Sequence, residues 1–193
     1  TIGDPEIFSF DTGIRGSFHS LESTFPVERT RVYCPSDAPD FSYNKPGSKR
    51  QKTTWIHRVA TTCKKLARGG IRSLVVFISD AERQTFLKFA AEEHLQAISY
   101  GNGVLAKDAA AAFKGGKGDV LVGSAANYAE GLDLPKGIAP MIFYLRPGFP
   151  NPNDAMCQFE ERKFSKSHVW AVRRWRETLR ALQHRDHPRF VTV

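Results

Sequence analysis

The chain has 193 residues, of which 41% are hydrophobic and 25% are charged. This length suits one well-buried α/β core with appendages and is short for two independent domains, and the composition argues against a disordered tail. No apolar run approaches the roughly 20 residues that span a bilayer, and no basic segment followed by an apolar core opens the chain. We therefore expect a cytoplasmic protein without a membrane partner.

The charge and the cysteines narrow the classes of partner. A net charge of +8 favours a polyanion, because Lys and Arg neutralise phosphates and release counterions. Charge alone does not establish that the partner is a nucleic acid, since many basic domains bind none. Cys34, Cys63 and Cys157 lie far apart without a C-x-x-C pair, which predicts free thiols and no metal or iron–sulfur site in this chain.

Residues 1–52 are expected to form an irregular lead-in followed by a basic loop. Residues 1–26 carry four phenylalanines among Gly, Ser and Asp, without a sustained helical or strand period. Residues 27–33 can form a short strand, and residues 35–52 collect loop-forming residues around the sequence PGSKR.

From residue 53 onward, helices and strands are expected to alternate. Residues 53–68 have an amphipathic helical period that ends at two glycines, and the apolar run at 73–78 is typical of a strand covered on both faces. Ser79 and Glu82 have capping-box spacing, so a helix should begin there. The further expected elements are strands at 95–99, 119–122, 141–145 and 190–193, and helices at 107–113 and 169–183.

This alternation predicts an α/β fold in which a mostly parallel central sheet lies between two layers of helices. In such sheets, ligands gather beyond the carboxyl ends of the strands. The loops after Ile78, Val122 and Leu145 are therefore the places where function is expected.

The long basic helix at 169–183 has two interpretations. Its arginines form either a solvated face or a wall of a single-strand channel, with Trp170 as a stacking platform. Trp175 lies on the apolar stripe and is expected in the core.

Several catalytic patterns are missing from the sequence. Residues 114–118, KGGKG, precede a strand, so their amides cannot sit at a helix N-terminus as those of a P-loop do. No paired carboxylates, Ser-His-Asp order or metal-type histidine cluster stands out.

The most informative segment is 123–135, GSAANYAEGLDLP, directly after the strand expected at 119–122. It resembles motif V of DinG/XPD-like superfamily 2 helicases, in which a glycine and small residues precede E-G-[VIL]-D-[VIFL]-P. The alternative is a glycine-rich loop with Asp133 capping a turn. Residues 74–80 resemble motif IV of the same family, and residues 141–154 resemble the strand and proline-rich loop after motif V.

The resemblance extends over about 71–154 and implies that residues 53–193 form the second RecA-like motor domain of such a helicase, a three-layer α/β/α sandwich. It implies contacts to the nucleic-acid backbone from three polar side chains, Ser79, Ser124 and Asn127. Helix capping is an equal alternative for Ser79. Arg146 is expected to contact either a phosphate or a neighbouring carboxylate.

The resemblance also implies an ATP-facing cleft. The residues that would face it are Glu130, Gly131 and Asp133. Motif VI departs from the family pattern Q-x-x-G-R-x-x-R: Gln183 matches, but the glycine and both arginines do not fall at their spacings. Arg185 or Arg189 could substitute as the catalytic arginine; a truncated or degenerate motif is the alternative.

Together these features imply one lobe of an ATP-dependent DNA helicase that translocates on single-stranded DNA and unwinds forked duplexes. ATP and Mg²⁺ would be held mainly by the first RecA-like lobe, without which this chain would be inactive. DinG-like helicases of CRISPR systems are among the expected relatives. The alternatives are a non-catalytic nucleic-acid-binding or docking module derived from such a lobe, and a flavodoxin-like or Rossmann enzyme, against which the missing G-x-G-x-x-G argues.

Overall fold

The computed structural model describes residues 4–19, 31–39, 47–128, 132, 134, 137–146, 148, 151, 153–182 and 190–192, with the side chains of 177–182 and 190–192 outside that description. Within these residues, no helix is both long enough and apolar enough to cross a bilayer.

The centre of the molecule is a six-stranded sheet in the order β1-β6-β5-β2-β4-β3, with every neighbouring pair parallel. Its strands are β1 Arg31–Tyr33, β2 Ser73–Phe77, β3 Ala97–Ser99, β4 Val120–Ser124, β5 Met141–Tyr144 and β6 Phe190–Thr192. The central strands β2, β4 and β5 are almost continuously apolar and buried, as a sheet covered on both faces requires. The predicted parallel sheet is confirmed.

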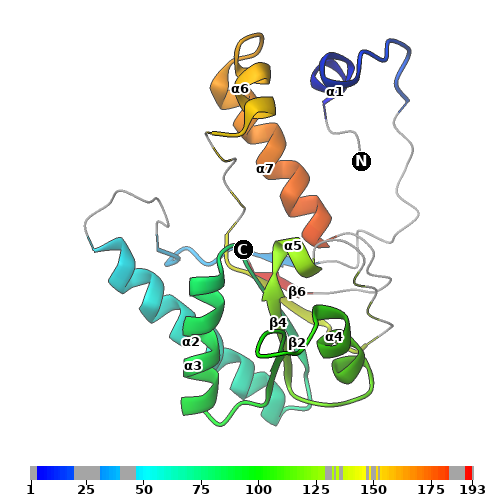
Figure 1. Ribbon diagram of the computed structural model, residues 1–193. Helices are drawn as coiled ribbons and strands as arrows, with labels where there is room; N and C mark the ends of the chain where they lie inside the picture. The colour runs from blue at the N-terminus through cyan, green and yellow to red at the C-terminus, as the bar shows by residue number, and fades with distance from the viewer. Residues whose placement is uncertain are drawn as a thin grey trace.

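Helices cover both faces of this sheet (Figure 1). On one face lie α2 (Ser48–Arg68) and α3 (Asp80–Glu92), which bury Ile56, Phe86 and their neighbours against β2, β4 and β5. On the other face lie α4 (Ala106–Lys114) and the short α5 (Ala125–Tyr128), with Phe113 and Tyr128 in the second core. The three-layer α/β/α arrangement predicted for the chain is therefore present.

The described residues before residue 53 include regular elements. Residues 5–12 form helix α1 (Pro5–Thr12), because Asp4 caps its N-terminus and Gly13, at φ 72°, ends it in the left-handed region. Strand β1 joins the central sheet, and α2 begins at Ser48, five residues before the expected start.

A third core joins α1, α6 (Ala155–Glu161) and α7 (Lys166–Leu182) outside the sandwich, where Ile7, Cys157 and Val169 are buried together. The guanidinium of Arg173 lies 2.7 Å from Glu160 and 2.7 Å from Asp154, and Glu160 is only 1% exposed. These ion pairs fix α7 to α6 and raise the pKa of Arg173, mainly through its hydrogen bond to Glu160.

The expectation that Trp175 lies in the core is wrong, because its side chain is 49% exposed. Helix α7 buries Val169 and packs Trp170 and Val172 against a small helical cluster that does not include Trp175.

The polarity of the strands positions the functional loops. All strands point the same way, so their carboxyl ends lie along one edge, which we call the carboxyl rim. Helix α2 leads into β2 and therefore begins at the carboxyl rim, and α5 follows β4 there and contacts α7. In Figure 1, α6 and α7 stand above this rim.

Candidate nucleic-acid interface

Ser79 lies directly beyond the carboxyl end of β2 and begins α3. Its hydroxyl accepts a hydrogen bond from the Glu82 amide at 3.3 Å, and its extended backbone (φ −117°, ψ 148°) is that of an N-cap residue. The capping role weighed from the sequence is therefore present. The side chain is only partly buried, so an oxygen of a bound phosphate could approach the first turn of the 13-residue α3.

Ser124 and Asn127 lie beyond the neighbouring strand β4. The β2–β4 register places Ser124 beside Phe77, two residues before Ser79, so the loops after β2 and β4 leave the sheet side by side. The Asn127 amide donates to the Ser124 hydroxyl at 3.1 Å, and Asn127 is exposed. The structure thus brings the three predicted backbone-contacting residues to adjacent positions on one rim.

Arg146 follows β5, the other neighbour of β2, and is engaged within the protein. Its guanidinium donates two hydrogen bonds to one Glu82 carboxylate oxygen, at 3.1 and 3.0 Å. Both side chains are largely buried, at 19% and 11% exposure. The carboxylate alternative is therefore present, and contact of Arg146 with a phosphate stays a prediction.

The remaining predicted residues, Glu130, Gly131, Asp133, Gln183 and Arg185, lie outside the described residues. Two leucines that alternate with them are described: Leu132 is 6% exposed and Leu134 is fully buried, both in the core on the α4 face. No group of three or more His, Cys, Asp or Glu side chains suited to a metal ion occurs among the described residues.

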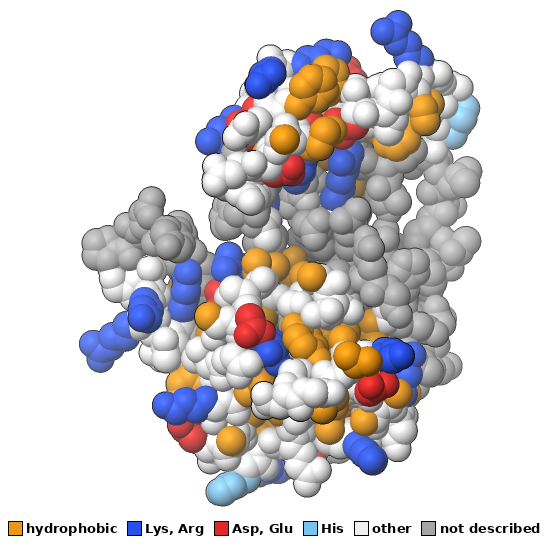
Figure 2. Space-filling model, in the orientation of Figure 1, with side chains coloured by type: hydrophobic (Ala, Val, Ile, Leu, Met, Phe, Trp, Pro, Cys, Tyr) orange, Lys and Arg blue, Asp and Glu red, His pale blue; other side chains and the backbone are white. Residues whose placement is uncertain are grey.

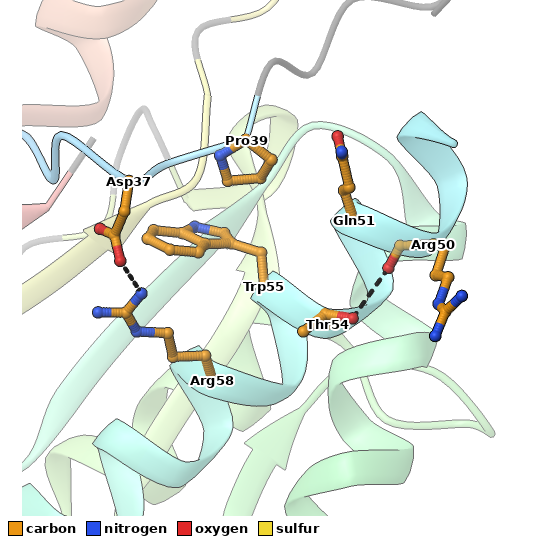
Figure 3. Close-up of a pocket in the computed structure, with 7 residues that line it drawn as sticks. All are labelled: Asp37, Pro39, Arg50, Gln51, Thr54, Trp55 and Arg58. Carbon is orange, nitrogen blue, oxygen red and sulfur yellow. Dashed lines mark hydrogen bonds and ion pairs between the residues drawn. The ribbon is translucent and has the colours of Figure 1, made fainter. Parts of the chain in front are cut away.

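Sequence reasoning missed a cavity of about 660 Å³ between the start of α2 and the segment after β1. Figure 3 shows the indole of Trp55 beside the guanidinium of Arg58, which is hydrogen-bonded to Asp37, while Pro39 and Gln51 border the same space. The Arg58 guanidinium carbon lies 4.8 Å from the Trp55 ring centroid. This cavity lies at the carboxyl rim, because β1 ends and α2 begins there.

The composition of α2 was the feature of the sequence that could have pointed to this cavity. The helix, SKRQKTTWIHRVATTCKKLAR, has seven Lys or Arg residues and no Asp or Glu. In Figure 2, Lys and Arg side chains gather over the N-terminal half of this helix. Such a cation-rich helix with an aromatic residue near its start combines two elements of single-strand binding.

No protein-family model and no curated protein matches the sequence. Several solved structures are similar to the chain in fold. An XPD helicase structure matches with a TM-score of 0.69 and 16% identity over 98% of this chain and 36% of that chain. An apo XPD structure matches with a TM-score of 0.65 and 13% identity, and the match covers 99% of this chain and 42% of that chain. The crystal structure of T4 UvsW matches with a TM-score of 0.52 and 11% identity, and the match covers 85% of this chain and 32% of that chain. This chain thus spans well under half of each of these proteins. What these structures share with it is the fold, a RecA-like α/β domain.

Proposed function

We propose that this chain is the second motor lobe of an ATP-dependent DNA helicase that translocates on single-stranded DNA and unwinds forked duplexes. The observation that carries the proposal is the grouping of Ser79, Ser124 and Asn127 beyond the ends of two adjacent parallel strands. Hydroxyl and amide groups at such a rim, beside a helix N-terminus, suit sequence-independent phosphate contact. The net charge of +8 supports a polyanionic partner.

The proposed division of labour leaves nucleotide binding mainly to a first RecA-like lobe. That lobe would supply the P-loop and the acids that hold Mg²⁺, while Glu130, Gly131 and Asp133 would face ATP across the closed cleft. Closure and opening around ATP would then move a strand along the rim. A DinG-like helicase, including one associated with a CRISPR system and acting in the cytoplasm, fits this scheme.

A non-catalytic nucleic-acid-binding or docking module is the second candidate. It is favoured by the missing glycine and arginine spacings after Gln183, because an arginine finger supplies a factor of about 10³ to 10⁵ in related NTPases. Only seven residues, 183–189, separate α7 from β6, and Arg185 and Arg189 are the arginines among them. This candidate keeps the strand-binding rim and dispenses with turnover.

Two measurements test the proposal. First, the chain alone should bind fluorescein-labelled single-stranded DNA, Ser79→Ala with Asn127→Ala should weaken that binding, and phosphate release from ATP should stay at background. Robust turnover by the chain alone would refute the division of labour.

Second, the chain should be joined to its P-loop lobe and assayed for DNA-stimulated ATP hydrolysis. The motor role predicts activity that Glu130→Gln or Asp133→Ala abolishes while circular dichroism is unchanged. An intact two-lobe protein that binds DNA but never hydrolyses ATP would instead establish the non-catalytic module.

A further inference from the structure

The cavity at Trp55 has the chemistry of a site for a planar, negatively charged ligand. It combines an indole with two guanidinium side chains, Arg50 and Arg58, and with the amide of Gln51. Its volume of about 660 Å³ falls within the roughly 300–1,000 Å³ of small-ligand pockets. An aromatic ring offers a face to any base, and an amide can pair with a base edge.

The charges around the cavity favour an anion. Among the described residues that line it, Asp37 is the one carboxylate, and the hydrogen bond from Arg58 lowers the pKa of Asp37 and offsets its charge. Lys49 and Arg50 are exposed on the first turn of α2, and α2 carries no acidic residue. A phosphate near this turn would therefore meet no uncompensated negative charge from the helix.

The position of the cavity connects it to the rim. A second cavity, of about 180 Å³, shares Trp55 and Arg58 with the first and reaches Tyr33 at the end of β1 and Leu145 beyond β5. Leu145 is next to Arg146, and β5 is next to β2, after which Ser79 lies. The two cavities, Arg146 and Ser79 thus lie along the same carboxyl rim, at or beyond the ends of β1, β5 and β2.

We propose that Trp55 is a base-stacking platform for single-stranded nucleic acid, with Arg50 and Lys49 taking the adjoining phosphate. This inference rests on the proposed function and extends its strand path beyond Ser79, Ser124 and Asn127. A free nucleotide offers the same base and phosphate. The continuity of the rim favours the strand, because a lone nucleotide would use only one end of it.

The test uses the 193-residue chain and three probes: a thymidine oligonucleotide, an oligonucleotide of equal length with abasic sites throughout, and AMP. Trp55→Ala should weaken binding of the thymidine oligonucleotide roughly 5- to 150-fold, the range that one base–aromatic stack supplies, with little effect on the abasic one. Trp55→Phe should restore most of the affinity, because a phenyl ring keeps a stacking face. Trp175→Ala, which removes an indole that is 49% exposed and outside this cavity, is the matched control.

The outcomes separate the two proposals. Unchanged binding by Trp55→Ala, or equal loss for the thymidine and abasic probes, overturns the stacking role, while Ser79→Ala with Asn127→Ala still reports on the motor interface. Tighter binding of AMP than of the oligonucleotide, lost in Trp55→Ala, assigns the cavity to a free nucleotide and overturns the strand assignment. If wild-type protein binds neither oligonucleotide, the proposed function fails as well.

Discussion

Gly123 determines how the loop after β4 leaves the sheet. A Cβ built at this position would lie 2.1 Å from the ring of Tyr128, which is 1% exposed and packs in the core on the α4 face. Burial raises the pKa of Tyr128 to about 12, and its hydroxyl donates to the Ala106 carbonyl at 3.2 Å. Glycine is therefore required here by the aromatic ring that anchors α5 to the sheet.

Gly123→Ala should lower the free energy of unfolding by about 1–3 kcal/mol, because the methyl group must displace a buried ring. Urea denaturation measures this change. In a Tyr128→Ala background the same substitution should cost much less, since the clashing ring is gone. Additive losses in the double variant would contradict this explanation.

The three cysteines should differ sharply in reactivity. Cys34 is exposed, whereas Cys63 and Cys157 are buried, and burial raises the pKa of both buried thiols. Since the thiolate is the reactive form, Ellman's reagent should modify Cys34 rapidly and the other two only after denaturation. Cys34→Ser should remove the fast phase; a fast phase that persists would show that a buried thiol is accessible.

At the scale of elements, one carboxylate links α1 to α7 in addition to their shared apolar core. Asp4 accepts hydrogen bonds from the Glu6 and Ile7 amides, each at 2.9 Å, and its second oxygen lies 3.0 Å from the His168 ring. The Ile7 hydrogen bond is the largest of the effects that lower the pKa of Asp4. The same side chain thus caps one helix and links it to another.

Asp4→Ala should destabilise the protein by about 0.5–2 kcal/mol near neutral pH, as loss of an N-cap does. Because the folded pKa lies below its ordinary value of 3.8, this stabilisation is present above that value and is lost as the pH falls through the folded pKa. The difference between wild type and variant, measured by urea denaturation, should therefore shrink in acid. Asp4→Asn, which keeps a capping oxygen, should retain part of it. A difference that grows in acid would contradict the assignment.

The sequence predicted all six described strands and the four longest helices, α2, α3, α4 and α7. Strands β2, β4 and β5 and helices α2, α3 and α4 have apolar runs or stripes that local patterns reveal. Helices α1, α5 and α6 have eight, four and seven residues, which is too short for a helical period to stand out. Local sequence patterns therefore predict the strands and long helices of the sandwich, and they do not reveal the short helices α1, α5 and α6.

The candidate site was predictable to a similar extent. Ser79, Ser124 and Asn127 follow strands that the sequence reveals, so their common rim follows from parallel strand order. Trp55 was not predicted, because its cavity depends on Asp37 and Pro39, which contact α2 only through the tertiary path of the segment after β1. The ion pair between Glu82 and Arg146 likewise joins residues 64 positions apart.

At the scale of the whole molecule, the net charge is +8. Helix α2 carries exposed cations at both of its ends, Lys49 and Arg50 at the carboxyl rim and Lys65 and Arg68 near the opposite edge. Only the first pair lies on the proposed strand path. The effect of total charge on DNA binding can therefore be separated from the effect of charge at one place by replacing each pair in turn.

Binding of single-stranded DNA should weaken with salt, and Lys49→Ala with Arg50→Ala should make the slope of log K against log salt less steep by roughly 1.4, since each phosphate contact contributes about 0.7. Lys65→Ala with Arg68→Ala, which removes the same net charge, should leave the slope nearly unchanged. Fluorescence anisotropy at several salt concentrations measures the slope for each of the two double variants. Equal effects of the two pairs would indicate diffuse attraction in place of a defined path.

The strand order has a consequence for how the protein is made. In the sheet, β6 lies between β1 and β5, so among the described strands β1 pairs only with β6. During translation, residues 31–33 must wait without their neighbour until residues 190–192 have left the ribosome. The segment that leads from β1 to Trp55 can therefore take its final place only after residues 190–192 have been synthesised.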